Sequence, residues 1–240
     1  MRKALWLAAL VPTLASAQMM GWFGYGGAAA AGPTLLSATG CVAPTTASPA
    51  SCTVPSIPSG AVMVAVYSSW AIATAPPSGT NLGSFTLAGG GAARSGLACT
   101  NAAGNDVACI YTAVAGSSLT NEVVSVSAAT GEKSALTVFV FTGANSSALS
   151  NVAFSYATSA TPSVSVTAVG TTSYVVGVLT SLGNQTFTPG TNTYVEYTTT
   201  SYSGLNIQHL RNTTAGGGTI ALSGTIGASQ EWAAAALEIR

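Results

Sequence analysis

Apolar and polar residues alternate in short segments along the chain from Thr34 onward, and these segments are rich in Val, Ile, Thr and Tyr. Gly, Pro, Asn and Ser separate them, which is typical of short strands joined by turns. No long segment combines a helical period with capping residues. The predicted strands are 62–67, 84–87, 108–113, 122–127, 136–141, 163–168, 174–180, 194–200, 204–210, 219–223 and 233–239. The pattern predicts an all-β protein.

Several of these strands carry apolar residues on both faces. Among them are Val-Met-Val-Ala-Val at 62–66 and Val-Phe-Val-Phe at 138–141. A strand that is apolar on both faces is typical of the centre of a sheet that is covered on both sides. We therefore expect a further layer, from the same chain or from another subunit, over the outer face of this sheet.

The chain contains an internal duplication. Residues 59–70 correspond to residues 171–182, an offset of 112, and a turn with Pro and Gly follows each segment. Each half then closes with an apolar strand, at 138–141 and 236–239, that follows an Ala-Gly turn. We expect pseudo-repeats over about 54–145 and 164–240.

Each repeat could form a small sandwich alone, or the two could share one. One shared sandwich is favoured, because each half has few large apolar residues and would leave a sheet face uncovered. The expected fold is an antiparallel, jelly-roll-like β-sandwich over 54–240, preceded by an arm and a first disulfide loop over 18–53.

The N-terminal residues have the order of a secretory signal peptide. Arg2 and Lys3 precede the apolar run at 4–11, and the small triplet Ala15-Ser16-Ala17 follows. The run is too short to span a bilayer, so residues 1–17 are expected to be removed and the mature protein to be secreted, extracellular or at the cell surface. The following Gly- and Ala-rich arm is predicted to be flexible, as a linker or as a contact arm through its aromatic residues, which are Trp22, Phe23 and Tyr25.

Charge is scarce, which changes the range of possible partners. Charged residues are 5% of the chain, and the formal net charge is zero. Nucleic-acid binding needs a basic surface, so that class is excluded. A hydrophobic content of 48% likewise excludes charge-driven disorder. Without residues 1–17, four basic residues remain against six acidic ones, a formal charge of −2.

The four cysteines predict disulfides. Three connectivities are possible, and the close spacings favour Cys41 with Cys52 and Cys99 with Cys109. Metal binding is disfavoured, because neither pair has the spacing of a zinc site and a single histidine cannot complete two such sites. No metal and no cofactor are expected.

No catalytic residue can be assigned. A hydrolase triad would have to use His209, the only histidine, and the chain has no G-x-S-x-G motif. A glycosidase needs two facing carboxylates, and nothing singles out a pair among Asp106, Glu122, Glu132, Glu196, Glu231 and Glu238.

Aromatic residues near Tyr194, Tyr197 and Tyr202 are the weak candidates for a binding face, with an ordinary Tyr-containing strand as the simpler interpretation. Three triplets, at Asn145, Asn184 and Asn212, match the N-glycosylation acceptor.

The strands at 59–66 and 174–178 and the closing Glu-Trp-Ala-Ala-Ala-Ala-Leu-Glu-Ile at 231–239 resemble a loose group of jelly-roll-like β-sandwich domains. These domains occur in bacterial surface proteins and in phage structural and tail proteins. The resemblance spans about 54–240. It implies a sandwich fold in a structural or adhesive setting, and it supplies no catalytic residue.

The function expected is that of an exported, non-enzymatic structural or adhesive protein, which associates with itself or with another surface protein. Its setting would be an extracellular filament, a surface layer or a virion-like particle. Scarce charge, two-sided apolar strands and an aromatic arm all favour association. A carbohydrate-binding module is the alternative, and a hydrolase is a third, weaker hypothesis. Neither nucleic acid nor a membrane span is expected.

Overall fold

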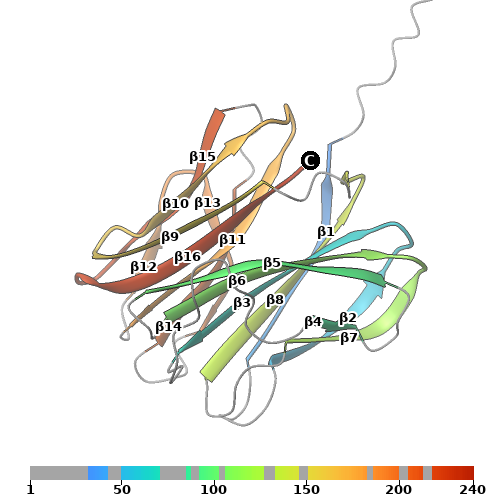
Figure 1. Ribbon diagram of the computed structural model, residues 1–240, viewed down its shortest axis with the longest axis horizontal. Coiled ribbons are helices and arrows are strands. Elements are labelled where there is room, and N and C mark those ends of the chain that lie inside the picture. Colours follow the sequence, from blue (N-terminus) through green and yellow to red (C-terminus); the bar gives the residue numbers. More distant parts are fainter. Residues whose placement is uncertain are drawn as a thin grey trace, which may run out of the picture. The chain divides into compact units, whose positions relative to one another are not determined.

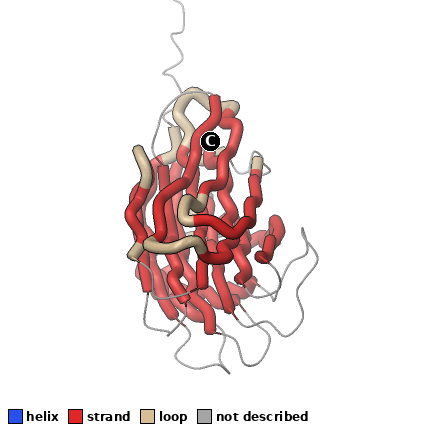
Figure 2. Tube along the Cα trace, turned by 90° about the vertical axis from the view of Figure 1, so that its left-hand side faces the viewer, coloured by secondary structure: helices blue, strands red, loops and turns tan. Residues whose placement is uncertain are grey.

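The computed structural model describes residues 32–42, 50–70, 85–87, 92–102, 106–126, 133–145, 151–182, 186–199, 205–212 and 218–240. These residues form strands and turns and contain no helix (Figure 2). The predicted all-β, antiparallel sandwich class is confirmed. The expected signal peptide and the aromatic arm lie outside the described residues.

The first half of the chain forms two antiparallel sheets. One has five strands in the order β1-β8-β3-β6-β5, and the other has three in the order β2-β7-β4 (Figure 1). The strands are β1 (Thr34–Val42), β2 (Ala50–Ile57), β3 (Val62–Trp70), β4 (Phe85–Leu87), β5 (Ala92–Ala102), β6 (Asp106–Ala115), β7 (Leu119–Val126) and β8 (Lys133–Thr142).

The second half repeats this order strand for strand. Its sheets run β9-β16-β11-β14-β13 and β10-β15-β12, the first-half order with each number raised by eight. The strands are β9 (Val152–Ser159), β10 (Ser163–Ala168), β11 (Tyr174–Leu182), β12 (Phe187–Pro189), β13 (Thr193–Thr199), β14 (Leu205–Asn212), β15 (Gly218–Ile226) and β16 (Gln230–Ile239). In each half the first strand lies beside the eighth, the second beside the seventh and the third beside the sixth, which is the wrapping of a jelly roll.

The duplication extends to the pairing register. Val62 pairs with Phe141 in the first half, and Tyr174 pairs with Ile239 in the second. Val62 and Tyr174 are the residues that the sequence duplication aligns, and Phe141 and Ile239 close the two aligned apolar strands. The two halves are therefore equivalent at the level of individual strand partners.

Three buried apolar clusters hold the strands together. Residues such as Met63, Tyr67 and Val140 fill the space between the sheets of the first half, and we call them the first-half core. Residues such as Leu179 and Leu222 fill the second half, as the second-half core. The third cluster contains residues of both five-stranded sheets, and we call it the central cluster; its fully buried members are Val62, Val64, Val66, Ala108, Ile110, Phe139, Phe141, Val176, Val178, Ala233, Ala235, Leu237 and Ile239.

The central cluster explains the strands that are apolar on both faces. Along β3, Val62, Val64 and Val66 face the central cluster, while Met63 and Ala65 face the first-half core. Burial on both faces was predicted for this strand and is confirmed. Across the central cluster the rings of Phe141 and Tyr174 lie 5.5 Å apart at 59°, a tilted arrangement that aromatic pairs favour.

The structure differs from the expectation of one shared sandwich, because each half has its own pair of sheets. The argument for sharing was that a half alone would leave a sheet face uncovered. That face is covered, but by the equivalent face of the other half: Val64 lies in the same buried cluster as Val176, its equivalent at the offset of 112.

Candidate contact surfaces

The outward face of the sheet β10-β15-β12 consists of hydroxyl-bearing and small side chains. Along β10, Val164, Val166 and Ala168 are buried, and the residues between them point outward. Cross-strand pairs on this outward face are Ser163 with Ser223, Ser165 with Ala221, Thr167 with Thr219 and Thr188 with Thr225. The β-branched and apolar residues thus fill the core, while Ser and Thr keep the face in contact with water.

The first half presents a similar outward face on the sheet β2-β7-β4. Ser51 pairs with Ser125 and Thr53 pairs with Val123, and Ser51, Thr53 and Val123 are exposed. Cys52, Val54 and Val124 alternate with them and are buried in the first-half core. Both outward faces therefore offer neutral hydroxyl groups.

Charged side chains are withdrawn from the surface in the described part of the chain. Asp106, Glu122 and Glu238 are buried. Glu231 and Arg240 are half-buried, as is Glu196. None of the charged side chains that the structure describes is exposed.

Glu238 is the centre of the best-defined polar site. Its Oε1 accepts hydrogen bonds from the Val169 and Gly170 backbone N–H groups at 2.9 and 3.0 Å and from the Ser173 hydroxyl at 2.6 Å. Its Oε2 accepts one from Asn151 Nδ2 at 2.6 Å and lies 3.8 Å from Arg240 Nε. The carboxylate thereby joins the last strand to the loop between β10 and β11.

The chemistry of this site is structural. Burial alone would raise the pKa of Glu238, but hydrogen bonds from Ser173, Gly170, Asn151 and Val169 outweigh it and hold the pKa below its usual value. A carboxylate with a lowered pKa is a poor general acid or base near neutral pH. Its oxygens are also occupied by protein donors, which leaves little room for a substrate.

Two buried tyrosines lie in the first-half core. Burial, together with the neighbouring Tyr67, raises the pKa of Tyr111 well above its usual value. Both side chains are about 1% exposed and belong to the apolar cluster. Tyr111 therefore stays neutral and serves the packing of β6.

The aromatic candidates from the sequence divide into described and undescribed residues. Tyr194 lies on β13, an edge strand, and is 47% exposed. The backbone of Tyr197 pairs with His209, but the side chains of both residues lie outside the described part. Tyr202 lies outside it entirely, as do Trp22, Phe23 and Tyr25.

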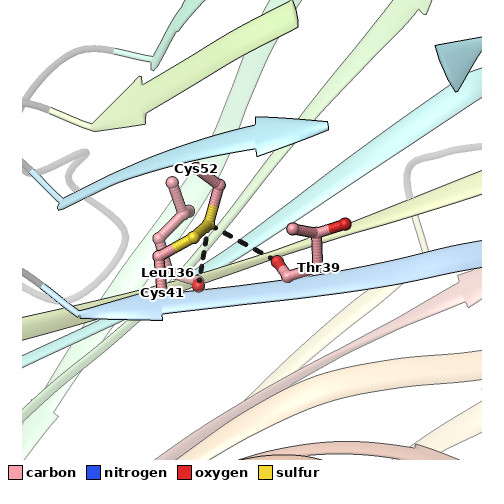
Figure 3. The surroundings of a disulfide bond; sticks show 4 residues. All are labelled: Thr39, Cys41, Cys52 and Leu136. Carbon is pink, nitrogen blue, oxygen red and sulfur yellow. Dashed lines mark hydrogen bonds between the residues drawn. A yellow bond between two sulfur atoms is a disulfide. The ribbon is translucent and has the colours of Figure 1, made fainter. Parts of the chain in front are cut away.

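The disulfide predicted between Cys41 and Cys52 is confirmed (Figure 3), with an S–S distance of 2.05 Å. It joins β1 at the edge of the five-stranded sheet to β2 at the edge of the three-stranded sheet. Cys52 Sγ lies 3.5 Å from the carbonyl oxygens of Thr39 and Leu136. The bond ties the two sheets of the first half along one side.

The second predicted pair lies in the β5–β6 ladder. Cys99 is directly opposite Cys109, and Cys109 is disulfide-bonded. The Cys99 side chain lies outside the described residues. Disulfides are typical of proteins that fold in an oxidising compartment.

No group of three or more His, Cys, Asp or Glu side chains that could hold a metal occurs within the described residues. In the same ranges, no helix is long and apolar enough to cross a bilayer.

The sequence interpretation missed the outward hydroxyl faces and the site around Glu238. The Ser-Val-Ser-Val-Thr-Ala alternation of β10 carried the signal for the first, since its polar members are all Ser or Thr. For the second, the signal was one carboxylate inside the apolar closing strand. A scan against protein-family models and searches of curated proteins and of solved structures found no match to this chain.

Proposed function

We propose that this protein is an exported, non-enzymatic structural or adhesive component that assembles with itself or with a surface. The observation that carries the proposal is that hydroxyl groups are exposed on the outward faces that the structure describes, whereas the described charged groups are buried or half-buried. Net charge keeps proteins apart in solution, and the formal charge of −2 on residues 18–240 opposes association only weakly. An extracellular filament, a surface layer or a virion-like particle is the setting that fits such a surface.

The composition of one edge strand supports the proposal. β9 is an edge strand with no charged residue and no proline, and it pairs with β16 without a bulge. On this strand Tyr156 is 60% exposed. Natural proteins usually blunt such edges with charge, proline or a bulge, because an open edge accepts a further strand. A strand of a second copy or of another surface protein could pair there.

The compartment is part of the proposal. Disulfides in the first half are what an oxidising environment permits. The signal-like residues 1–17 and the resemblance to jelly-roll domains of surface and phage structural proteins favour the same setting.

Sedimentation velocity of residues 18–240 over a range of concentrations tests the proposal. We expect the mean sedimentation coefficient to rise with concentration. The rise should change little between low and high NaCl, because few ionic contacts are available to be screened.

Matched variants give the test its control. Thr53→Lys and Ser165→Lys place a charge on the two outward faces and should reduce association, whereas the neutral changes Thr53→Ser and Ser165→Thr should not. A protein that stays monomeric at every concentration would contradict assembly with itself. Association that the two lysine variants leave intact would contradict the role of the outward faces.

A further inference from the structure

The outward face of the sheet β10-β15-β12 is hollowed at one end. The hollow has a volume of about 560 Å³, within the roughly 300–1,000 Å³ that is usual for small-ligand sites. Six of its lining residues carry hydroxyl groups: Thr161, Ser163, Thr188, Thr191, Ser223 and Thr225. They come from the β9–β10 turn, from each of the three strands and from the turn after β12.

Backbone hydrogen bonds fix the walls of the hollow. The Gly190 N–H donates to the Ser223 carbonyl at 2.8 Å, and the Gly224 N–H donates to the Pro162 carbonyl at 3.1 Å. At the rim, Thr193 N–H donates to the Gly190 carbonyl at 3.1 Å, and the intervening Asn192 has a φ of 58°, which Asn tolerates. The Ser223 N–H donates to Thr193 Oγ1 at 3.2 Å. The hollow is therefore preformed.

Two glycines allow this close approach of the backbone. A Cβ on Gly190 would overlap the Ser223 hydroxyl, and a Cβ on Gly224 would overlap the Phe187 ring and lie 2.6 Å from the Thr188 carbonyl oxygen. Larger residues at either position would push the turn away from β15 and alter the floor of the hollow.

The hydroxyl groups of the lining are available for a ligand. Within the described part of the chain, none of the six hydroxyl groups takes part in a hydrogen bond. The bonds from Thr161 to the Ser159 hydroxyl and from Ser223 to the Thr193 hydroxyl use the backbone N–H groups of Thr161 and Ser223. Each hydroxyl can donate and accept, and its hydrogen can rotate to suit a partner. No charged residue is among the described residues that line the hollow, so an ionic ligand would find no counter-charge among them.

We propose that this hollow binds a neutral saccharide. A sugar matches the lining because its own hydroxyls both donate and accept, and because it needs no counter-charge. The exposed ring of Pro189 adds apolar surface for the C–H face of a sugar. The inference rests on the proposed function in its adhesive version. It specifies that the surface to which the protein adheres is a neutral polysaccharide.

Isothermal titration of residues 18–240 with soluble hexasaccharides tests the inference. The probes are cellohexaose, maltohexaose, mannohexaose and N-acetylchitohexaose, with hexagalacturonate as the anionic comparison. We expect at least one neutral probe to bind and hexagalacturonate to bind more weakly. Thr188→Val and Thr225→Val remove hydroxyls and preserve side-chain shape, so each should raise the Kd roughly twofold to tenfold.

Three variants serve as controls. Thr167→Val and Thr219→Val make the same change on the same sheet face outside the hollow, and they should leave the Kd unchanged. Tyr194→Ala tests the aromatic edge strand instead. Circular dichroism and thermal unfolding of each variant establish that it is folded, and Ser223→Ala replaces any hollow variant that is not.

The inference is overturned if no neutral probe binds, if hexagalacturonate binds as tightly as the best neutral probe, or if Thr167→Val, Thr219→Val or Tyr194→Ala weakens binding as much as the hollow variants do. Sedimentation of the same samples separates this failure from a failure of the proposed function. Self-association without saccharide binding removes the inference alone. A monomer that binds no saccharide removes both.

Discussion

At the residue scale, Glu238 marks a clear difference in chemistry between the two halves. It pairs with Val175, and Val140 occupies the equivalent position opposite Met63 in the first half. Val140 contributes to an apolar core, whereas Glu238 receives four hydrogen bonds from groups in the 151–173 segment. The same position in the two closing strands thus packs in an apolar core in the first half and anchors a loop in the second.

Replacing this carboxylate should weaken the fold. We predict that Glu238→Gln lowers the free energy of unfolding by roughly 2–3 kcal/mol at neutral pH, since hydrogen bonds to a charged acceptor are lost. The amide would also point a donor toward groups that are themselves donors. Urea unfolding measures the change. Glu231→Gln on the same strand is the control and should have little effect, because Glu231 is half-buried and forms no hydrogen bond to the described residues.

The same residue should make stability depend on pH. Because folding lowers the pKa of Glu238, its contribution is complete above the unfolded value of about 4.3 and is lost as the pH falls through the lower folded value. The difference between the wild type and Glu238→Gln should therefore shrink in acid. A difference that stays constant from neutral pH into acid would show that the carboxylate charge is not what anchors the loop.

At the element scale, the sequence predicted central strands well and edge strands poorly. The strands that it did not predict are β1, β2, β5, β9 and β12, and each of them is an edge strand. A central strand such as β3 is buried on both faces and needs apolar, β-branched residues throughout. An edge strand such as β9 packs on one side, and its Ala and Ser residues give no clear alternation.

The hollow shows why sites were harder to predict than strands. Its lining combines residues from the 161–163, 188–191 and 223–225 segments. Single Ser and Thr residues are common throughout this chain, so no local pattern marks these ones. What brings them together is the register of β15 with β10 and β12, which depends on long-range pairing.

Edge strands of the first half are also held covalently. We predict that the double change Cys41→Ala and Cys52→Ala lowers the free energy of unfolding by roughly 2–4 kcal/mol. The reason is that the bond restricts the conformations of the unfolded chain, so its removal raises the entropy that is lost on folding. The urea midpoint should fall. The single changes Cys41→Ala and Cys52→Ala should be at least as destabilising as the pair, since each leaves a free thiol. A double variant as stable as the wild type would mean that packing alone holds β1 against β2.

At the scale of the whole described unit, the halves pack through their five-stranded sheets, and some of the contacts join equivalent strands. β3 contacts its equivalent β11. β1 contacts β13, and the equivalent contact with the halves exchanged, between β9 and β5, is also made. β16 also contacts β5 and β6, whereas within the described residues its equivalent β8 makes no comparable contact with β13 and β14. The packing between the halves is therefore only partly reciprocal, unlike a true isologous interface.

The extent of this interface predicts cooperative unfolding. Fully buried apolar residues of both five-stranded sheets form the central cluster, so neither half can unfold without exposing apolar surface on the other. Scanning calorimetry should show one transition with equal calorimetric and van't Hoff enthalpies. Phe139→Ser combined with Val176→Ser should separate the transition into two. Two transitions in the unmodified protein would contradict coupling through this cluster.

The central claim is that this protein acts by contact between neutral surfaces, and electron microscopy of purified residues 18–240 tests it most directly. We predict ordered assemblies, as filaments, sheets or closed particles, that are lost when Thr53→Lys and Ser165→Lys are combined. A field of single molecules at every concentration, together with no attachment to neutral polysaccharide, would contradict the claim.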